Sequence, residues 1–269
     1  MPDSSLINGV EMANIKNVDG IDAPPASVTL LSDLDFTTMT SDDWTGESTV
    51  SLNGQTWTIG NGGNSTVFGP NGSNLILEPK ASSVGDWYNT ARTGPYLGIK
   101  LSALDSSLNA SAEYVVQTVC NSYPGGGANF ARFMAGFWSD DAVSRGYTCL
   151  FGTQYNGADK YYYYVGGTQQ ATANAGGNEL TFYTKLSRDG FNTCLVSTSA
   201  DGNTPNAGTY KGAIYASTDS PAIAGSQQTL TLTASAPVNV GLVFVGDTSG
   251  AQPTFTVNRM RIWKIEPQI

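Results

Sequence analysis

Short apolar and aromatic runs recur along most of the chain, and Gly, Asn, Ser and Thr fill the segments between them. Turn residues that return this often between short apolar runs predict many short β-strands. Two packed antiparallel sheets would give such strands a common core. The predicted strands are Ser73–Pro79, Pro95–Leu101, Ala112–Asn121, Phe130–Trp138, Gly146–Tyr155, Lys160–Val165, Glu179–Leu186, Asn192–Ser199, Thr229–Ala234, Val238–Val245 and Thr254–Ile265.

Helical periodicity is almost absent. Only the segment Leu101–Leu108 could form one short turn of helix. No other stretch combines an apolar period of 3.6 residues with capping residues. The pattern therefore predicts an all-β fold.

The last predicted strand contains a break in its alternation. Phe255 and Val257 share one face, whereas Met260 and Ile262 have the opposite parity. A β-bulge near Asn258-Arg259 would bring all four apolar side chains to the inner face, because a bulge inserts one residue. Three basic side chains would then point toward solvent or a neighbouring subunit: Arg259, Arg261 and Lys264.

Residues 1–27 contain a short repeat. Ile7-Asn8-Gly9-Val10 returns as Val18-Asp19-Gly20-Ile21. Asn, Asp and Gly between apolar residues are typical of tight turns, because they tolerate backbone conformations that β-branched residues resist. Two units of this size cannot bury a core of their own and need a neighbour for stability. We therefore predict that residues 1–27 form an extended arm that docks on a partner chain.

Pro24-Pro25 would separate this arm from the body of the chain, residues 28–269, because adjacent prolines favour a stiff polyproline conformation. The alternative is a leader that folds back on its own domain, as terminal segments often do. In the docked arm, the apolar contacts would come from Ile7, Val10, Ile15, Val18 and Ile21.

Composition narrows the classes of function. The formal net charge is −9, and the 13 basic residues are scattered singly, so the basic stripe needed for nucleic-acid binding is missing. No apolar run is long enough to span a membrane, and the N-terminal order of residues is not that of a signal peptide. We therefore expect synthesis in a cytoplasm and no membrane or nucleic-acid partner.

Histidine is absent, which excludes Ser-His-Asp and Cys-His nucleophiles and the commonest zinc sites. The three cysteines, Cys120, Cys149 and Cys194, lie in predicted strands without metal-binding spacing. We predict that they are buried free thiols. Neither a cofactor nor a metal is expected.

Two acidic pairs could bind calcium, Asp42-Asp43 and Asp140-Asp141. Neither has the alternating Asp-x-Asp-x-Asp spacing of a calcium loop, so we interpret both as solvated turns. A further candidate is Asp86-Trp87-Tyr88-Asn89. Aromatic rings flanked by carboxylate and amide groups suit sugar binding, although packing of Trp87 and Tyr88 under a long loop is the competing interpretation.

Four consecutive tyrosines, Tyr161, Tyr162, Tyr163 and Tyr164, fall within one predicted strand. Because side chains alternate along a strand, two rings must lie on each face. We predict that one pair enters the core and that the other faces outward. Outward tyrosines favour protein interfaces, and a glycan surface is the competing use.

Two segments of the body resemble concanavalin A-like jelly rolls. Asp33-Leu34-Asp35-Phe36 followed by Asp43-Trp44-Thr45 is similar to the opening strand of that superfamily. Residues 254–263, TFTVNRMRIW, are similar to its closing strand. The resemblance covers about residues 28–269 and implies a jelly-roll β-sandwich of two antiparallel sheets, with the first and last strands side by side in one sheet.

Retaining glucanases of this superfamily carry Glu-x-Asp-x-x-Glu, which sets two carboxylates about 5 Å apart. This motif is absent here. The one Asp-x-Asp is Asp33-Leu34-Asp35, which the resemblance places at the domain entrance. The six glutamates are far apart in sequence: Glu11, Glu47, Glu78, Glu113, Glu179 and Glu266. We therefore expect no enzymatic activity.

The arm contains Asn8-Gly9-Val10 and, at residues 13–21, the sequence ANIKNVDGI. With these residues it resembles N-terminal segments of structural proteins of tailed bacteriophages. The resemblance implies a non-enzymatic virion protein, either a capsid decoration or cement protein or a head fibre or spike. Its partners would be other capsid or tail proteins, and it would self-associate as a homo-oligomer such as a trimer. One alternative is a tail-fibre or tail-tip adhesin that binds host surface glycan, and a second is a glycan hydrolase.

Overall fold

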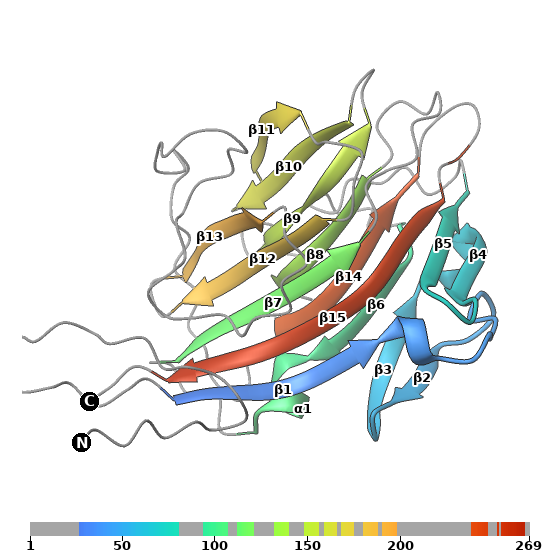
Figure 1. Cartoon of the computed structure of the whole chain (residues 1–269), viewed down its shortest axis with the longest axis horizontal. Coiled ribbons are helices and arrows are strands. Elements are labelled where there is room, and N and C mark those ends of the chain that lie inside the picture. Colours follow the sequence, from blue (N-terminus) through green and yellow to red (C-terminus); the bar gives the residue numbers. More distant parts are fainter. Residues whose placement is uncertain are drawn as a thin grey trace, which may run out of the picture.

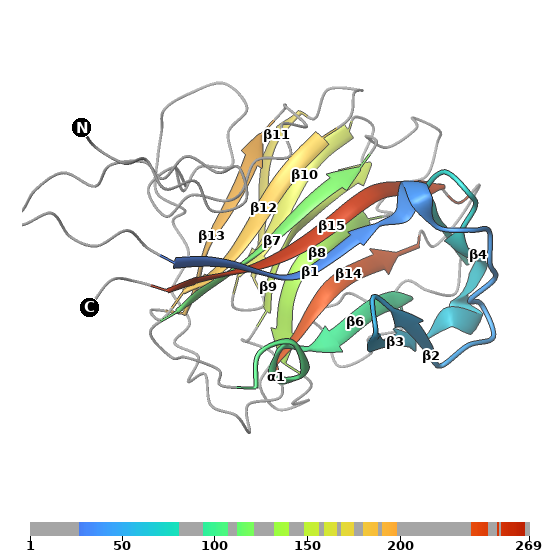
Figure 2. The same cartoon turned by 60° about the horizontal axis from the view of Figure 1, so that its bottom comes forward.

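The computed structural model describes residues 27–80, 94–106, 112–120, 132–139, 148–155, 159–165, 168–174, 180–187, 190–197, 238–246, 252 and 254–266. Within these residues the chain forms two antiparallel sheets that pack face to face (Figures 1 and 2). The fold is a jelly-roll β-sandwich, as the sequence predicts. In the described ranges three short helices accompany the strands: η1 (Phe36–Thr38), η2 (Gly62–Asn64) and α1 (Leu101–Leu104).

One sheet has seven described strands in the order β13-β12-β7-β15-β5-β4, and β1 also pairs with β15. Figure 1 shows β1 and β15 side by side, the arrangement that the jelly-roll resemblance implies. We call this the β15 sheet. Its strands are β1 (Ser27–Asp35), β4 (Ser65–Pro70), β5 (Leu75–Pro79), β7 (Glu113–Cys120), β12 (Leu180–Ser187), β13 (Gly190–Ser197) and β15 (Phe255–Glu266).

The other sheet has eight described strands in the order β11-β10-β9-β8-β14-β6-β3-β2, and we call it the β14 sheet. Its strands are β2 (Thr49–Leu52), β3 (Gln55–Gly60), β6 (Tyr96–Lys100), β8 (Arg132–Ser139), β9 (Thr148–Tyr155), β10 (Asp159–Val165), β11 (Thr168–Asn174) and β14 (Val238–Val245).

Each strand predicted from the sequence is present where the structure describes the chain, whereas Thr229–Ala234 lies outside the described residues. The sequence pattern did not predict four of the observed strands, β2, β3, β4 and β11. A signal for β2 and β3 existed, because Asn53-Gly54 joins them in a tight turn. Both residues have positive φ, 51° and 75°, the conformation that favours Asn-Gly in two-residue hairpins.

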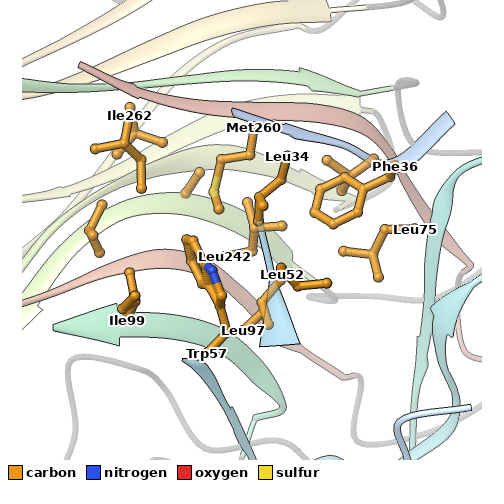
Figure 3. Packing of buried hydrophobic residues seen from close by; sticks show 14 of the residues in the cluster. Leu34, Phe36, Leu52, Trp57, Leu75, Leu97, Ile99, Leu242, Met260 and Ile262 are labelled. Atoms are coloured by element: carbon orange, nitrogen blue, oxygen red, sulfur yellow. The ribbon is translucent and has the colours of Figure 1, made fainter. Parts of the chain in front are cut away.

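The core lies between the two sheets. Figure 3 shows Leu34, Met260 and Ile262 from the β15 sheet facing Trp57, Leu97 and Leu242 from the β14 sheet. All six side chains are almost completely buried. Burial of this continuous apolar cluster is the main term that holds the two sheets together.

The predicted bulge in β15 is confirmed. The pairing of β15 with β7 shifts register between Val257 and Arg259. As a result Phe255, Val257, Met260 and Ile262 all lie in the core.

The prediction for Lys264 was wrong. Lys264 is only 8% exposed, because it shares the inward parity of Ile262, two residues earlier. Its ammonium group lies 2.9 Å from a carboxylate oxygen of Asp105 and 2.9 Å from one of Glu266. These carboxylates compensate the charge that burial would otherwise leave unpaired.

Candidate functional site

Most of the site residues predicted from the sequence lie outside the described residues. These are the arm residues Ile7, Asn8, Gly9, Val10, Ile15, Val18, Asp19, Gly20 and Ile21, and the motif Asp86, Trp87, Tyr88 and Asn89. The structure instead describes two features that bear on function. One is the attachment of β1, the strand that follows the arm, and the other is an aromatic pair on the outer face of the β14 sheet.

β1 is held by antiparallel pairing with β15 from Ser27, opposite Glu266, to Asp35, opposite Arg259. The pairing contains one irregularity, between Leu30 and Ser32. β15 also pairs with β7 on its other side, so β1 is joined to an interior strand of the sheet. The strand that continues from the arm is therefore built into the sandwich.

An ion-pair network lies across β1 and β15 on the outer face. Arg259 donates two hydrogen bonds to Asp33, from Nε to Oδ1 at 2.7 Å and from Nη2 to Oδ2 at 2.6 Å. Arg261 donates to Asp33 Oδ2 at 3.4 Å and to Gln117 Oε1 at 3.1 Å. Asp35 Oδ2 lies 3.6 Å from Nη1 of Arg259. We call these five residues the β1 clamp.

The clamp changes the ionisation of Asp33. Burial by itself would raise the pKa of this carboxyl. The hydrogen bonds and positive charges of Arg259 and Arg261 outweigh burial and hold the pKa of Asp33 below its ordinary value. Arg259 in turn has a raised pKa, mainly through its hydrogen bonds with Asp33.

The Asp-x-Asp that the sequence singled out is thus part of a structural ion-pair network. Both carboxylates contact Arg259, which comes from the far end of the chain. Alternating acids on the first strand and alternating arginines on the last strand were a usable signal. The resemblance already implied that these strands are neighbours, so their charges could have been paired across the ladder.

The outer face of the β14 sheet carries the aromatic pair Tyr96 and Trp138. Their ring centroids are 5.8 Å apart, with the planes at 77°. Trp138 is 1% exposed, whereas Tyr96 is half-buried. An edge-to-face contact of this kind is attractive and holds the two rings in place.

Glycine makes room for these rings. Gly98, Gly241 and Gly136 are paired in one rung across β6, β14 and β8. A Cβ atom on Gly98 would lie 2.8 Å from Cζ2 of Trp138, so the indole rests directly on the bare backbone of β6. Sequence reasoning missed this site, although each of the three strands has a single Gly between two apolar residues.

Tyr161, Tyr162, Tyr163 and Tyr164 lie on β10 of the same sheet. Tyr164 pairs with Leu150 of β9, and Leu150 pairs with Gly136, so this position continues the glycine rung. The side chains of the four tyrosines are outside the described part of the structure. Their division between core and surface stays a prediction.

Asp42 and Asp43 behave as turn residues. Asp42 accepts hydrogen bonds from its neighbour's amide and from the indole N–H of Trp44. Asp43 accepts from the amide of Thr45, which holds the pKa of Asp43 below its ordinary value. Asp140-Asp141 lies outside the described residues, and within them no group of three or more potential ligands could hold a metal ion.

Cys120 is a buried free thiol, as predicted. Cys149 and Cys194 lie on β9 and β13, and their side chains are not among those described. The helices in the described ranges are too short to cross a membrane.

No protein-family model matches the chain, and no curated protein matches its sequence. Among solved structures, the chain is similar to an endo-1,3-β-glucanase from Streptomyces sioyaensis, with a TM-score of 0.46 and 15% identity over 92% of this chain and 100% of the other. It is similar to the CBM2 module of the evolved Dit of Lactobacillus casei BL23 phage J-1, with a TM-score of 0.44 and 10% identity over 91% and 99%. A protein of unknown function from Shewanella oneidensis MR-1 gives a TM-score of 0.46 and 11% identity over 89% and 87%. We draw no functional conclusion from likenesses this distant.

Proposed function

We propose that this chain is a non-enzymatic structural protein of a tailed-bacteriophage virion. In this proposal the arm binds a capsid or tail protein, and the sandwich decorates the particle or forms part of a fibre or spike. The observation that carries the proposal is the β1 clamp. It joins β1, the strand that continues from the arm, to an interior strand of the β15 sheet, so a docked arm would hold the whole sandwich in place.

The resemblance of residues 1–27 to N-terminal segments of phage structural proteins supports the same function. An arm of this kind can pair with a strand edge of its partner, where backbone hydrogen bonds give affinity and alternate side chains give specificity. Five apolar side chains that are each half buried would add on the order of 1 kcal/mol apiece. Together these contributions are large enough to decide whether the arm is bound to its partner or free.

The missing carboxylate pair supports the non-enzymatic part of the proposal. Purified protein should release no reducing ends from β-glucan, alginate or host polysaccharide. Turnover that disappears on substitution of a single Asp or Glu would refute this part.

Particle incorporation tests the proposal as a whole. The full chain and a variant that lacks residues 1–26 would be supplied during phage growth, and their copies per purified particle would be compared. We expect the truncated variant to be absent from particles while it remains folded. Ile15→Asp with Val18→Asp should reproduce this loss, whereas the matched polar change Lys16→Gln should not. Normal occupancy of the truncated variant would overturn the proposal.

A second candidate is a host-binding adhesin, favoured by the Tyr96 and Trp138 pair on the outer face of the β14 sheet. Aromatic faces stack on the C–H faces of sugars, and Tyr96 is the accessible member of the pair. Binding of host surface polysaccharide would be measured by calorimetry for the wild type and Tyr96→Ala, with the exposed Thr56→Ala on the same face as control. Binding lost only in Tyr96→Ala would support the adhesin, and unchanged binding would exclude this surface.

A further inference from the structure

A second buried ionic group lies at the end of the sandwich where β1 begins and β15 ends. Lys264 Nζ contacts Asp105 Oδ2 and Glu266 Oε1, both at 2.9 Å. Tyr114, completely buried on β7, donates a hydrogen bond from its hydroxyl to the same Asp105 Oδ2 at 2.8 Å. Lys264 and Asp105 are each only 8% exposed.

We propose that Lys264 and Asp105 condense into an intramolecular isopeptide bond, with Glu266 as the proton carrier and Tyr114 as the group that polarises the Asp105 carboxyl. The proposal is independent of the arm and of the virion. It turns a contact between β15 and the segment that precedes β7 into a covalent link.

The chemistry balances without a co-reactant. The Lys264 ammonium first gives up a proton to the Asp105 carboxylate, where it comes to lie on Oδ1, and this leaves an amine and a carboxylic acid. The Nζ lone pair then forms a bond to Cγ of Asp105. The Glu266 carboxylate takes a proton from Nζ and delivers it to the departing hydroxyl of Oδ1, which leaves as water. Oδ2, already bonded to Tyr114, remains as the amide oxygen.

The positions of the reacting groups in the fold favour the reaction. Effective concentrations reach roughly 10⁵–10⁸ M where two reacting groups are held in a well-oriented geometry, so contact within the fold favours an otherwise slow reaction. The hydroxyl of Tyr114 is a fixed donor at the oxygen that gains negative charge when the amine attacks. Both features exist before any bond forms.

Burial favours the product. A buried ion pair loses much of its attraction to the cost of removing two charges from water, whereas an amide carries no charge. Burial lowers the pKa of Lys264, but hydrogen bonds with Asp105 and Glu266 outweigh it and hold the pKa raised. The resting state is therefore the ion pair. The neutral pair, an amine on Lys264 and a carboxylic acid on Asp105, contains the same number of protons. It forms when one proton moves from Lys264 to Asp105.

Glu266 is suited to move the proton. Its side chain is 41% exposed, so the released water has a path to solvent. The hydroxyl of Ser27 donates to Glu266 Oε2 at 3.0 Å, which leaves Oε1 directed at Lys264. The Arg259 and Asp33 pair of the β1 clamp lacks an amine and cannot condense in this way.

Intact-mass spectrometry of the folded, purified full-length chain tests the proposal. We expect the wild type to be lighter than its sequence by one water molecule, and protease digestion to yield a branched peptide that joins residues 105 and 264. Lys264→Arg keeps the positive charge but offers no amine for this bond, so it should show the full mass. Glu266→Gln should begin at the full mass and lose water at least tenfold more slowly than the wild type.

Each outcome decides the proposal. A wild type that retains its full mass after prolonged incubation in the folded state overturns it. Loss of water from Lys264→Arg as well would place the dehydration elsewhere, for example in a succinimide, and also overturns it. Melting curves recorded on both variants show whether they are folded, and Glu266→Gln retains both reacting groups if Lys264→Arg does not fold.

Discussion

Asp33 and Arg259 are separated by 226 positions in the chain, yet they form a two-pronged ion pair on the outer face of the β15 sheet. The pair joins β1 to β15 near the end of their shared ladder at which Asp35 faces Arg259. A planar guanidinium matches both carboxylate oxygens at once, so the pair fixes the register of the two strands as well as adding attraction. The terminal strands of the described chain are thus locked to each other.

Removal of this pair should cost stability in a pH-dependent way. The lowered pKa of Asp33 means that its contribution is fully present above the ordinary carboxyl pKa of about 3.9 and is lost as the pH falls through the folded value. We expect Asp33→Asn to lower the free energy of unfolding by about 1–2 kcal/mol at neutral pH, since both partners are partly exposed. The difference from the wild type should shrink as the pH falls below this ordinary value.

Urea unfolding at several pH values would measure this effect. The solvent-exposed Glu47→Gln serves as the control for a lost surface carboxylate and should leave the free energy of unfolding unchanged. A difference between Asp33→Asn and the wild type that does not shrink at all as the solution is acidified below the ordinary carboxyl pKa would contradict the assignment.

The sequence predicts the fold class because the apolar runs and their alternation are local properties. The bulge in β15 could be predicted for the same reason, since the parity of Val257 and Met260 can be compared directly. β4 and β11 could not, because Ser65–Pro70 and Thr168–Asn174 are short or polar and depend on neighbouring strands for their pairing.

Lys264 shows where an assignment by residue type fails although the parity is clear. The alternation that buries Ile262 also buries Lys264, but a lysine is normally assigned to the surface. Only the position of Asp105, far earlier in the chain, shows that the charge has a buried partner. The Tyr96 and Trp138 pair was hidden in the same way, because β14 separates their strands in the sheet.

Gly98 should be intolerant of a side chain. Its added Cβ would lie 2.8 Å from Trp138, and because the indole is 1% exposed, it would have to displace its neighbours to withdraw. We expect Gly98→Ala to lower the free energy of unfolding by about 1–3 kcal/mol, the usual cost of overpacking. Thermal melting would measure the change, with Gly63→Ala as the matched control, because a Cβ there meets nothing within 4 Å. Equal melting temperatures for the two variants would contradict the close contact.

Cys120 should resist alkylation in the native protein. Its thiol is completely buried on β7, and apolar surroundings disfavour the reactive thiolate. In a Cys149→Ser and Cys194→Ser background, labelling by iodoacetamide should require unfolding and should become complete in denaturant. Rapid labelling under native conditions would show that β7 opens or that the thiol is accessible.

Truncation from the N-terminus should divide the chain sharply between an arm that the body does not need and a strand that it does. Removal of residues 1–26 leaves the whole of β1 and its pairing with β15. Removal of residues 1–35 also deletes Leu34, which is completely buried, together with Asp33 and the β1–β15 ladder. Loss of the Leu34 side chain alone is worth about 2–5 kcal/mol, a large part of the 5–15 kcal/mol that stabilises an ordinary domain.

We therefore expect the shorter truncation to melt within a few degrees of the full chain, and the longer one to be unfolded or to melt far lower. Leu34→Ala in the full chain separates the lost core contact from the lost strand and should fall between them. Circular dichroism melts of the four proteins would give the order. A large loss of stability on removal of residues 1–26 would mean that this segment contributes to the folded body, and the arm would then have to be reassigned as part of the sandwich.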